Sequence, residues 1–350
     1  MSTNRTIKIA HKIISDESDC FVIAEIGHNH QGDLETAKRL FETAKYCGVD
    51  AVKLQKRNNR SLYTKKYFDT AYNSENAFGK TYGLHRQALE FGKKQYKYLK
   101  RYAEKLGIIF FVTAWDFKSV DFLNDIGVNC FKTASSDIHN IPLLTYVAKF
   151  KKPMIVSTGT ATLEDVKRAY RAIVAINSKL VLMQCTAAYP APAHLLDLRV
   201  IETYKKEFPE AIIGFSSHFN GISVDPVAYT LGARVIEKHF TLDRAMKGSD
   251  HAFSLEPVGM RKLVRDLQRV KMALGDGVKK FYEEEKAGLY KMGKCIVAAR
   301  SLKAGQTIGR SDLTFKSPFE GLLPYEADKF YGKVLKTPLK KDQLLKLEYV

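Results

Sequence analysis

The sequence predicts an α/β fold of the (β/α)8 type, a TIM barrel, followed by a small C-terminal β-rich domain. Strand-like apolar runs recur eight times in the first 275 residues, and amphipathic helical patterns separate them. Glycines that would end a helix stand before several of these runs, at Gly48, Gly107, Gly127 and Gly232. Eight such units in this length have the size of a closed barrel.

The predicted strands alternate with predicted helices along the chain. After the first strand, Leu34, Ala37, Leu40, Phe41 and Ala44 recur at helical spacing. An open doubly wound sheet is the structural alternative, but it favours a G-x-G-x-x-G turn after its first strand, and residues 27–32 lack that spacing. The closed barrel is therefore preferred. Its strands are expected at 20–27, 51–56, 108–115, 129–135, 153–160, 180–187, 211–218 and 234–241.

The repeating pattern ends near residue 275, which predicts a domain boundary. The barrel domain is expected at 1–275, a linker at 276–293 and the C-terminal domain at 294–350. Short β-like pieces with turns between them fill the last segment. A domain of this size buries only a small core, so it is expected to need support from a neighbour.

The formal net charge of +18 raises the question of nucleic-acid binding. Lysines and arginines are scattered over several predicted helices, however, and form no basic arm or nucleic-acid motif. A solvated basic surface is the favoured interpretation, so no nucleic-acid partner is expected. The surplus positive charge is suited to attracting anionic substrates.

Cysteine usage and hydropathy indicate a cytoplasmic protein. The five cysteines are odd in number and form no C-x-x-C pair, which is typical of reduced, buried thiols. No run approaches the ~18 apolar residues of a membrane span, and the N-terminus lacks the apolar segment of a signal peptide. We therefore expect no membrane association.

Two histidines, His218 and His239, end neighbouring predicted strands. The C-terminal ends of barrel strands are where barrels place their active sites. A single histidine there is more often structural, but two on adjacent strands favour a metal site. Two imidazoles leave positions open for water and substrate, which suits a divalent Lewis acid such as Mn²⁺, Mg²⁺ or Co²⁺.

Two lysines, Lys53 and Lys132, also emerge at strand ends among several hydroxyls. Together they form a cradle for anions, most simply a phosphate and a carboxylate. Glu25 beside them is a candidate base. Either lysine acting as a Schiff-base nucleophile, as in an aldolase, is the alternative, although that chemistry requires no histidine pair. The strand-end polar residues are Glu25, Lys53, Gln55, Thr113, Lys132, Ser135, Asp137, Ser157, Thr158, Thr186, Ser216, His218, Glu237 and His239.

Short motifs along the whole chain carry a family resemblance. They are 24–32 (AEIGHNHQG), 53–55 (KLQ), 79–83 (GKTYG), 131–132 (FK), 184–186 (QCT), 189–190 (YP), 214–218 (GFSSH), 237–241 (EKHFT) and 247–251 (KGSDH). With these motifs the chain resembles the sialic acid synthases, which are the N-acetylneuraminate synthases and relatives that make other nonulosonic acids. Residues 297–300 and 303–305 resemble the antifreeze-like (SAF) domain of that family.

The resemblance implies condensation of phosphoenolpyruvate with an N-acetylhexosamine, N-acetylmannosamine, and release of phosphate by C–O cleavage. It implies metal binding by His218 and His239, proton transfer by Glu25, and a homodimer in which the SAF domain covers the partner's active site. The phosphoenolpyruvate contacts it implies are Lys53, Thr113, Lys132, Ser135, Ser157 and Ser216. The sugar contacts it implies are Gln55, Asp137, Tyr189 and Asp250.

Three departures from the bacterial pattern concern the substrate contacts. Ala187 replaces an asparagine, Asp137 replaces a glutamate, and residues 316–319 (KSPF) lack the arginine of the SAF domain. The acceptor therefore stays open between N-acetylmannosamine, its 6-phosphate, mannose 6-phosphate and a bacillosamine-derived sugar. A carbohydrate- or ice-binding protein without catalysis is the alternative outside the enzymes.

Overall fold

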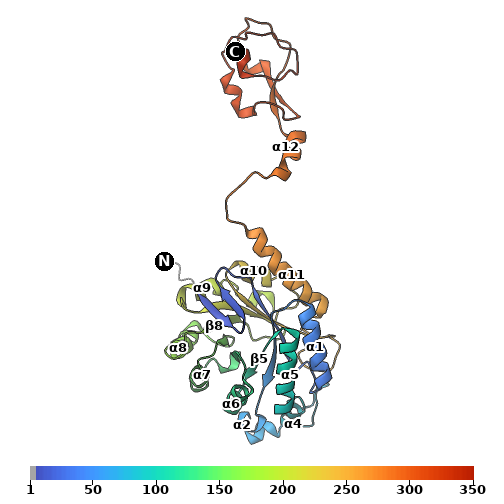
Figure 1. The fold of residues 1–350 in the computed structure, drawn as a ribbon, viewed down its shortest axis with the longest axis vertical. Helices are drawn as coiled ribbons and strands as arrows, with labels where there is room; N and C mark the ends of the chain where they lie inside the picture. The colour runs from blue at the N-terminus through green and yellow to red at the C-terminus, as the bar shows by residue number, and fades with distance from the viewer. Residues whose placement is uncertain (1–4) are drawn as a thin grey trace. The chain divides into compact units, whose positions relative to one another are not determined.

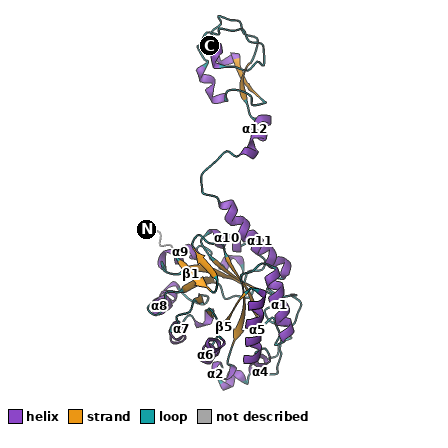
Figure 2. Ribbon diagram, viewed as in Figure 1, coloured by secondary structure: helices purple, strands orange, loops and turns teal. Residues whose placement is uncertain are grey.

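The computed structural model describes residues 5–350, which form two compact units that divide between Gly275 and Asp276. In the first unit, eight parallel strands close into a barrel and helices surround it, as Figure 1 and Figure 2 show. The predicted fold class, a TIM-like barrel followed by a small domain with an antiparallel sheet, is confirmed. In the part of the chain described, none of the helices is both long and apolar enough to cross a bilayer.

The barrel strands pair in chain order, and the last strand, β10, closes the barrel on the first, β3. Each strand lies within one of the eight apolar runs predicted from sequence. Their bounds are β3 Phe21–Gly27, β4 Ala51–Lys56, β5 Ile109–Ala114, β6 Phe131–Thr133, β7 Met154–Ser157, β8 Leu180–Cys185, β9 Ile212–Ser217 and β10 Val235–His239.

The longer helices, such as α1, α5 and α8, bury an apolar stripe against the outside of the barrel. In the first of them, Asp33 caps the N-terminus by accepting from the Thr36 amide, and Ala37, Leu40 and Phe41 are buried. The helices are α1 Leu34–Tyr46, α2 Asn59–Leu62, α3 Lys65–Phe68, α4 Tyr82–Ala88, α5 Lys93–Leu106, α6 Phe117–Ile126, α7 Ile141–Ala148, α8 Leu163–Val174, α9 Val200–Glu207, α10 Asp225–Thr230 and α11 Pro257–Leu274.

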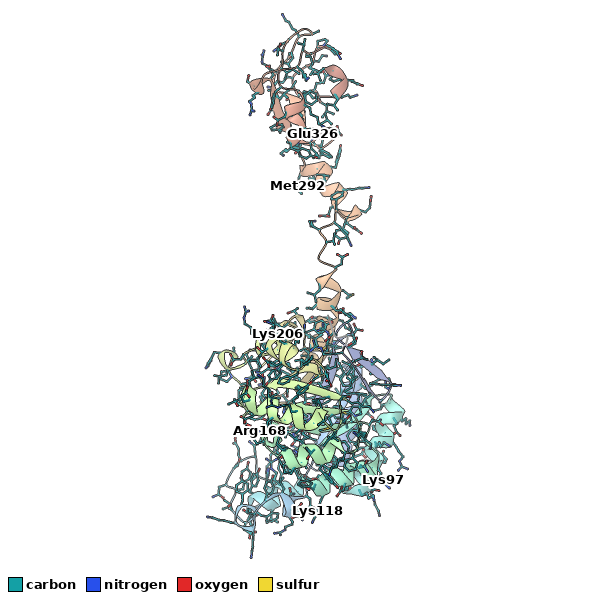
Figure 3. All side chains as sticks on the ribbon, turned by 90° about the vertical axis from the view of Figure 1, so that its left-hand side faces the viewer. Lys97, Lys118, Arg168, Lys206, Met292 and Glu326 are labelled. Carbon is teal, nitrogen blue, oxygen red and sulfur yellow. The ribbon has the colours of Figure 1, made fainter. Side chains whose placement is uncertain are left out.

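Basic side chains are spread around this ring of helices. Lys97, Lys118, Arg168 and Lys206 lie on α5, α6, α8 and α9 respectively, and all four are exposed (Figure 3). The positive charge of the chain is therefore distributed over separate helices.

Apolar side chains fill the lower part of the barrel interior. Inward residues of the strands, including Ile23, Phe111 and Met183, form a single buried cluster. An N-terminal hairpin that the sequence analysis did not predict, β1 Thr6–Ile9 and β2 Lys12–Ser15, adds Ile9 and Ile14 to the same cluster. The hairpin therefore closes the N-terminal end of the barrel.

The second unit contains the antiparallel pair β11 Cys295–Ala298 and β12 Leu313–Lys316. Ile296, Phe330 and Leu335 belong to its own small buried core. The segment before it, which the sequence analysis treats as a linker, includes η3 Glu283–Glu285 and the short helix α12 Lys286–Met292.

The hairpin supplies a stability prediction. Ile9 is fully buried in the barrel floor, so Ile9→Ala should lower the free energy of unfolding of the barrel by about 2–5 kcal/mol, the usual cost of a new cavity. Ile13 on the same hairpin is 63% exposed, and Ile13→Ala should change it by less than about 0.5 kcal/mol. Urea denaturation measures both. Equal effects of the two variants would show that the hairpin does not close the barrel.

Candidate active site

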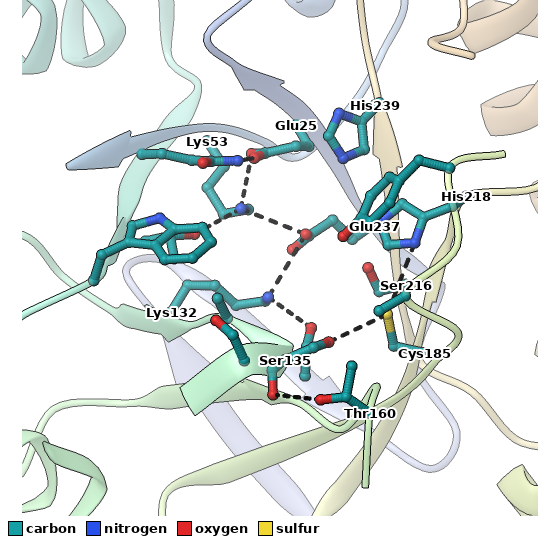
Figure 4. Close-up of a pocket in the computed structure, with 18 residues that line it drawn as sticks. Glu25, Lys53, Lys132, Ser135, Thr160, Cys185, Ser216, His218, Glu237 and His239 are labelled. Atoms are coloured by element: carbon teal, nitrogen blue, oxygen red, sulfur yellow. Dashed lines mark hydrogen bonds and ion pairs between the residues drawn. The ribbon is translucent and has the colours of Figure 1, made fainter. Parts of the chain in front are cut away.

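A cavity of about 260 Å³ opens at the C-terminal ends of the barrel strands, above the apolar floor. Figure 4 shows its lining side chains converging from all eight strands and the loops that follow them. Most of the site residues expected from sequence meet here. Those that line the cavity are Glu25, Lys53, Gln55, Thr113, Lys132, Ser135, Ser157, Tyr189, Ser216, His218 and His239.

Four buried charged side chains from β3, β4, β10 and β6 alternate in sign across the interior of the barrel. Lys53 Nζ lies 2.8 Å from Glu25 Oε2 and 3.4 Å from Glu237 Oε1, and Lys132 Nζ lies 3.6 Å from the same oxygen of Glu237 (Figure 4). We call Glu25, Lys53, Glu237 and Lys132 the charge chain. Burial of so many charges requires this pairing, because isolated ions are strongly disfavoured away from water.

Hydroxyl and amide groups add hydrogen bonds to three members of the charge chain, Lys53, Lys132 and Glu25. The ammonium of Lys53 donates to Thr113 Oγ1 at 2.7 Å, and that of Lys132 donates to Ser157 Oγ at 2.7 Å. The Gln55 side-chain amide donates to Glu25 Oε1 at 2.6 Å. Each lysine thus has a hydroxyl neighbour, as a cradle for an anion requires.

The electrostatics give the four groups different protonation behaviour. Burial raises the pKa of Glu25, and the negative charge of Glu237 adds to this, although Lys53 opposes it. Burial acts in the same direction on Glu237, but Lys132 and Lys53 outweigh it and hold its pKa below the usual range. Burial lowers the pKa of Lys132, whereas for Lys53 the two carboxylates outweigh burial and raise it. Glu25 is therefore the carboxylate best suited to exchange a proton, and Lys53 is a firm cation.

The two histidines lie side by side in the cavity wall, at the ends of the neighbouring strands β9 and β10, with ring centroids 5.4 Å apart. His218 Nδ1 lies 2.8 Å from the carbonyl oxygen of Thr186, so it donates there and leaves Nε2 as a free acceptor. The Nδ1 atom of His239 is buried without a hydrogen-bond partner. Burial lowers the pKa of His239 to about 4, which keeps its ring neutral, the form that binds metal ions.

The two imidazoles fit an open metal site, in which water or substrate completes the coordination. They are too few for a closed site, in which the protein supplies all the ligands. Within residues 5–350, no group of three or more His, Cys, Asp or Glu side chains is arranged to hold an ion. A metal at this position would need further ligands from water or substrate.

Two of the expected sugar contacts lie outside the cavity lining. Asp137 is buried, accepts from the Asn140 amide at 3.3 Å, and has its pKa raised by burial to about 6. Asp250 Oδ2 lies 3.8 Å from His239 Nδ1. Asp250 therefore adjoins the histidine pair from behind, while Asp137 is set back from the cavity.

Sequence reasoning missed some of the cavity residues. Glu237 was noted as a strand-end residue, yet no role followed, although it stands two residues before His239 and therefore on the same inward face of β10. Trp115, directly after β5, also lines the cavity. The guanidinium of Arg57 lies 3.9 Å from the Trp115 ring, a contact between distant parts of the sequence that no local pattern indicates.

Comparison with known proteins places the chain among sugar acid synthases. Residues 40–279 match the NeuB family, and residues 293–348 match the SAF domain. The chain is 39% identical to the N-acetylneuraminate-9-phosphate synthase of Mus musculus over 96% of this chain and 94% of the relative. It is 36% identical to the N,N'-diacetyllegionaminic acid synthase of Campylobacter jejuni over 93% and 98% respectively.

Solved structures show the same likeness. A sialic acid synthetase from Leptospira borgpetersenii, crystallised in complex with citrate, is 34% identical, with a TM-score of 0.69 over 81% of this chain and 95% of that chain. The spore coat polysaccharide biosynthesis protein SpsE of Bacillus subtilis is 29% identical, with a TM-score of 0.67 over 99% of both chains.

Two buried histidines beside the cavity predict a loss of stability in mild acid. Burial lowers the pKa of His30 to about 3, and burial together with Arg57 lowers that of His28 well below its usual value. In the unfolded chain both would titrate near pH ~6.5. As pH falls below that value, the unfolded state binds more protons than the folded state, so stability present above pH ~6.5 is lost progressively as pH falls towards about 3, the folded-state pKa of His30.

The size of this effect can be checked by urea denaturation at a series of pH values. Below the unfolded pKa, each such histidine should remove up to about 1.4 kcal/mol of unfolding free energy per pH unit. His30→Gln should make the decline shallower, whereas His11→Gln, at an exposed position, should leave it unchanged. An identical decline in His30→Gln and wild type would contradict the argument.

Proposed function

Because the chain belongs to the NeuB family, and a SAF domain follows its barrel, we propose that it is a sialic acid synthase that condenses phosphoenolpyruvate with N-acetylmannosamine. Its reaction class is broader than this one substrate pair: the chain is a transferase, a nonulosonic acid synthase that joins phosphoenolpyruvate to a sugar. The observation that carries the finer proposal is a pair of buried lysines with hydroxyl partners, which share one cavity with His218 and His239.

Phosphoenolpyruvate carries a carboxylate and a phosphate close together, and the lower cavity is suited to both. Lys53 with Thr113 and Lys132 with Ser157 offer two cationic centres, each with an adjacent hydroxyl. In the structure both lysines share Glu237 as a counter-ion. A bound phosphate and carboxylate would give each lysine an anionic partner of its own, in place of the shared Glu237. We assign Ser135 and Ser216, which also line the cavity, as further donors.

The bond-forming step places opposite charges at two points of the cavity. The enol carbon attacks the sugar aldehyde, so the aldehyde oxygen gains negative charge and the carbon that bears the phosphate gains positive charge. A carboxylate beside that carbon stabilises it, and Glu25 is in this position if phosphoenolpyruvate contacts Lys53. Water then adds to the carbon, and Glu25 accepts a proton from it that can pass to the alkoxide formed from the aldehyde. The C–O bond to phosphate breaks as the added hydroxyl loses its proton and becomes the keto oxygen.

A divalent cation, Mn²⁺, Mg²⁺ or Co²⁺, completes the proposal. His218 and His239 would hold it, and it would supply a Lewis acid that polarises the aldehyde oxygen. The free Nε2 of His218 and the lowered pKa of His239, which keeps its ring neutral, support this role. Gln55 and Tyr189 in the lining, with Asp137 and Asp250 near it, are the proposed sugar contacts.

The N-acetylmannosamine 6-phosphate is the second candidate acceptor, because relatives 39% identical are named N-acetylneuraminate-9-phosphate synthases. Mannose 6-phosphate and a bacillosamine-derived sugar use the same chemistry. Family membership assigns the chain to the enzymes, so a purely carbohydrate- or ice-binding role is set aside.

We also propose a cytoplasmic homodimer in which the SAF domain, expected at 294–350 behind a linker at 276–293, covers the partner's active site. All five cysteines are unpaired, as in a reducing compartment. Phe315, Tyr325 and Val334 of the SAF domain are exposed apolar side chains suited to docking.

The proposal is tested by phosphate release from phosphoenolpyruvate in the presence of N-acetylmannosamine and Mn²⁺. Release should require the sugar, cease after thorough chelation and return when Mn²⁺ is added. His239→Ala should reduce turnover by at least ~10²-fold, the scale for losing a principal electrostatic stabiliser. His194→Ala, on the short helix η2 Ala193–Leu195, is an exposed control that should retain full activity. Full turnover of chelated enzyme would remove the metal from the mechanism.

Glu25→Gln tests proton transfer separately from binding. Glutamine keeps the shape and the hydrogen bond to Gln55 but not the basicity, so turnover should fall ~10²-fold or more while phosphoenolpyruvate still binds. Calorimetric titration with phosphoenolpyruvate measures the binding. Near-normal turnover of Glu25→Gln would eliminate the proposed role.

A further inference from the structure

A buried lysine on the outer side of the barrel wall lies beside both histidines of the cavity. Along β10, Glu237 and His239 line the cavity, so Lys238 between them points outward, towards the helices. On β9, Ser216 lines the cavity, and Ser217 therefore points outward as well. Lys238 is only 1% exposed, although lysine is almost never fully buried unless it is paired.

The ammonium group of Lys238 connects the segments that carry the two histidines. It donates to Ser217 Oγ at 2.8 Å and to the carbonyl oxygen of Phe219 at 2.6 Å. These acceptors belong to the residues directly before and after His218. His239 directly follows Lys238 itself. One side chain thus bonds to both chain neighbours of the first histidine and precedes the second.

His218 depends on such contacts because it lies beyond the end of the strand pairing. The register of β9 with β10 ends at the pair Ser217 and Lys238. His239, by contrast, remains paired with Glu25 on β3. The backbone of His239 is therefore fixed by the barrel ladder, whereas that of His218 is not.

The other hydrogen bonds of His218 come from the opposite side. Its Nδ1 donates to the carbonyl oxygen of Thr186, and its own carbonyl oxygen accepts from the Ala191 amide at 3.0 Å. Both of these residues follow β8. Beyond the ladder, the hydrogen bonds of Lys238 are thus the ones that join the His218 segment to β10.

Asp225 supplies the negative charge that allows Lys238 to be buried. It is the first residue of α10, it is fully buried, and its Oδ2 lies 3.6 Å from Lys238 Nζ. Both residues lie on the helix side of the barrel wall, outside the cavity lining. Any effect of this ion pair on the reaction therefore passes through the histidines.

We propose that Lys238, paired with Asp225, is a positioning residue that holds His218 at the distance from His239 that a divalent cation requires. The inference rests on the proposed metal site and adds to it two residues that touch neither metal nor substrate. Loss of the groups that hold metal ligands in place typically weakens metal affinity about 10- to 100-fold.

The test is calorimetric titration of metal-free protein with Mn²⁺. Lys238→Met combined with Asp225→Asn removes both charges, so no unpaired buried ion is left behind. This double variant should raise the Kd for Mn²⁺ about 10- to 100-fold and leave the Kd for phosphoenolpyruvate, measured without metal, unchanged. Its turnover should return towards that of wild type as Mn²⁺ is raised to saturation.

Arg5→Met combined with Asp16→Asn is the matched control. It removes another ion pair, 2.9 Å long, which flanks the hairpin at the N-terminal end of the barrel. The control should be less stable to urea but bind Mn²⁺ as wild type does. An unchanged Kd for Mn²⁺ in the Lys238 double variant, or an equal rise in the control, would overturn the inference. So would a raised Kd for phosphoenolpyruvate, which would indicate general loosening of the barrel mouth.

Ser217→Ala replaces the double variant if the latter does not fold. It keeps both charges and removes one of the two hydrogen bonds to the neighbours of His218. Its Kd for Mn²⁺ should rise about 3- to 10-fold, the scale of one hydrogen bond. A Kd equal to that of wild type would overturn the positioning role.

Failure of the proposed function would look different. If no acceptor supports phosphate release, but Mn²⁺ binds to wild type and more weakly to the double variant, the synthase proposal fails and the positioning role is supported. If phosphate is released and both proteins bind Mn²⁺ equally, the positioning role fails alone. Wild type that binds no Mn²⁺ would overturn this role together with the metal site.

Discussion

The alternation of charge inside the barrel is the interaction on which the site depends. Glu25, Lys53, Glu237 and Lys132 come from four strands, and each is stable in its buried position because the next one pairs with it. In the proposed function, a doubly anionic substrate would compete with Glu237 for the two lysines. Glu237 therefore keeps the ammonium groups of Lys53 and Lys132 paired until the substrate replaces it.

Barrel closure explains why so much of this site could be predicted. Side chains alternate along a strand, so Lys53 and Gln55 share the inward face of β4 with Ala51 below them. The same spacing places His239 above Val235 on β10. A polar residue at the end of an apolar run is visible in the sequence, and closure brings all such ends together.

Contacts between distant segments could not be predicted in this way. The hairpin strands β1 and β2 are only four residues each, too short for a clear pattern in the sequence. The role of their apolar residues is visible only in the structure, where Ile9 packs into the barrel floor. Arg57 and Trp115 belong to different βα loops, and the sequence around each residue does not indicate that they stack on each other. Asp250 reaches His239 from a long loop after the last strand. Such positions are set by tertiary packing, which carries no local period.

The apolar floor beneath the charge chain has a kinetic consequence. With Ile9, Phe111 and Met183 packed below, the lysines are approached only from the mouth, where the histidines and Tyr189 stand. A ligand on the lysines lies deeper than one beside the histidines. In the proposed function, the three-carbon donor would therefore bind first and the sugar would bind above it. The closed floor of the barrel would thus impose an ordered binding of the two substrates.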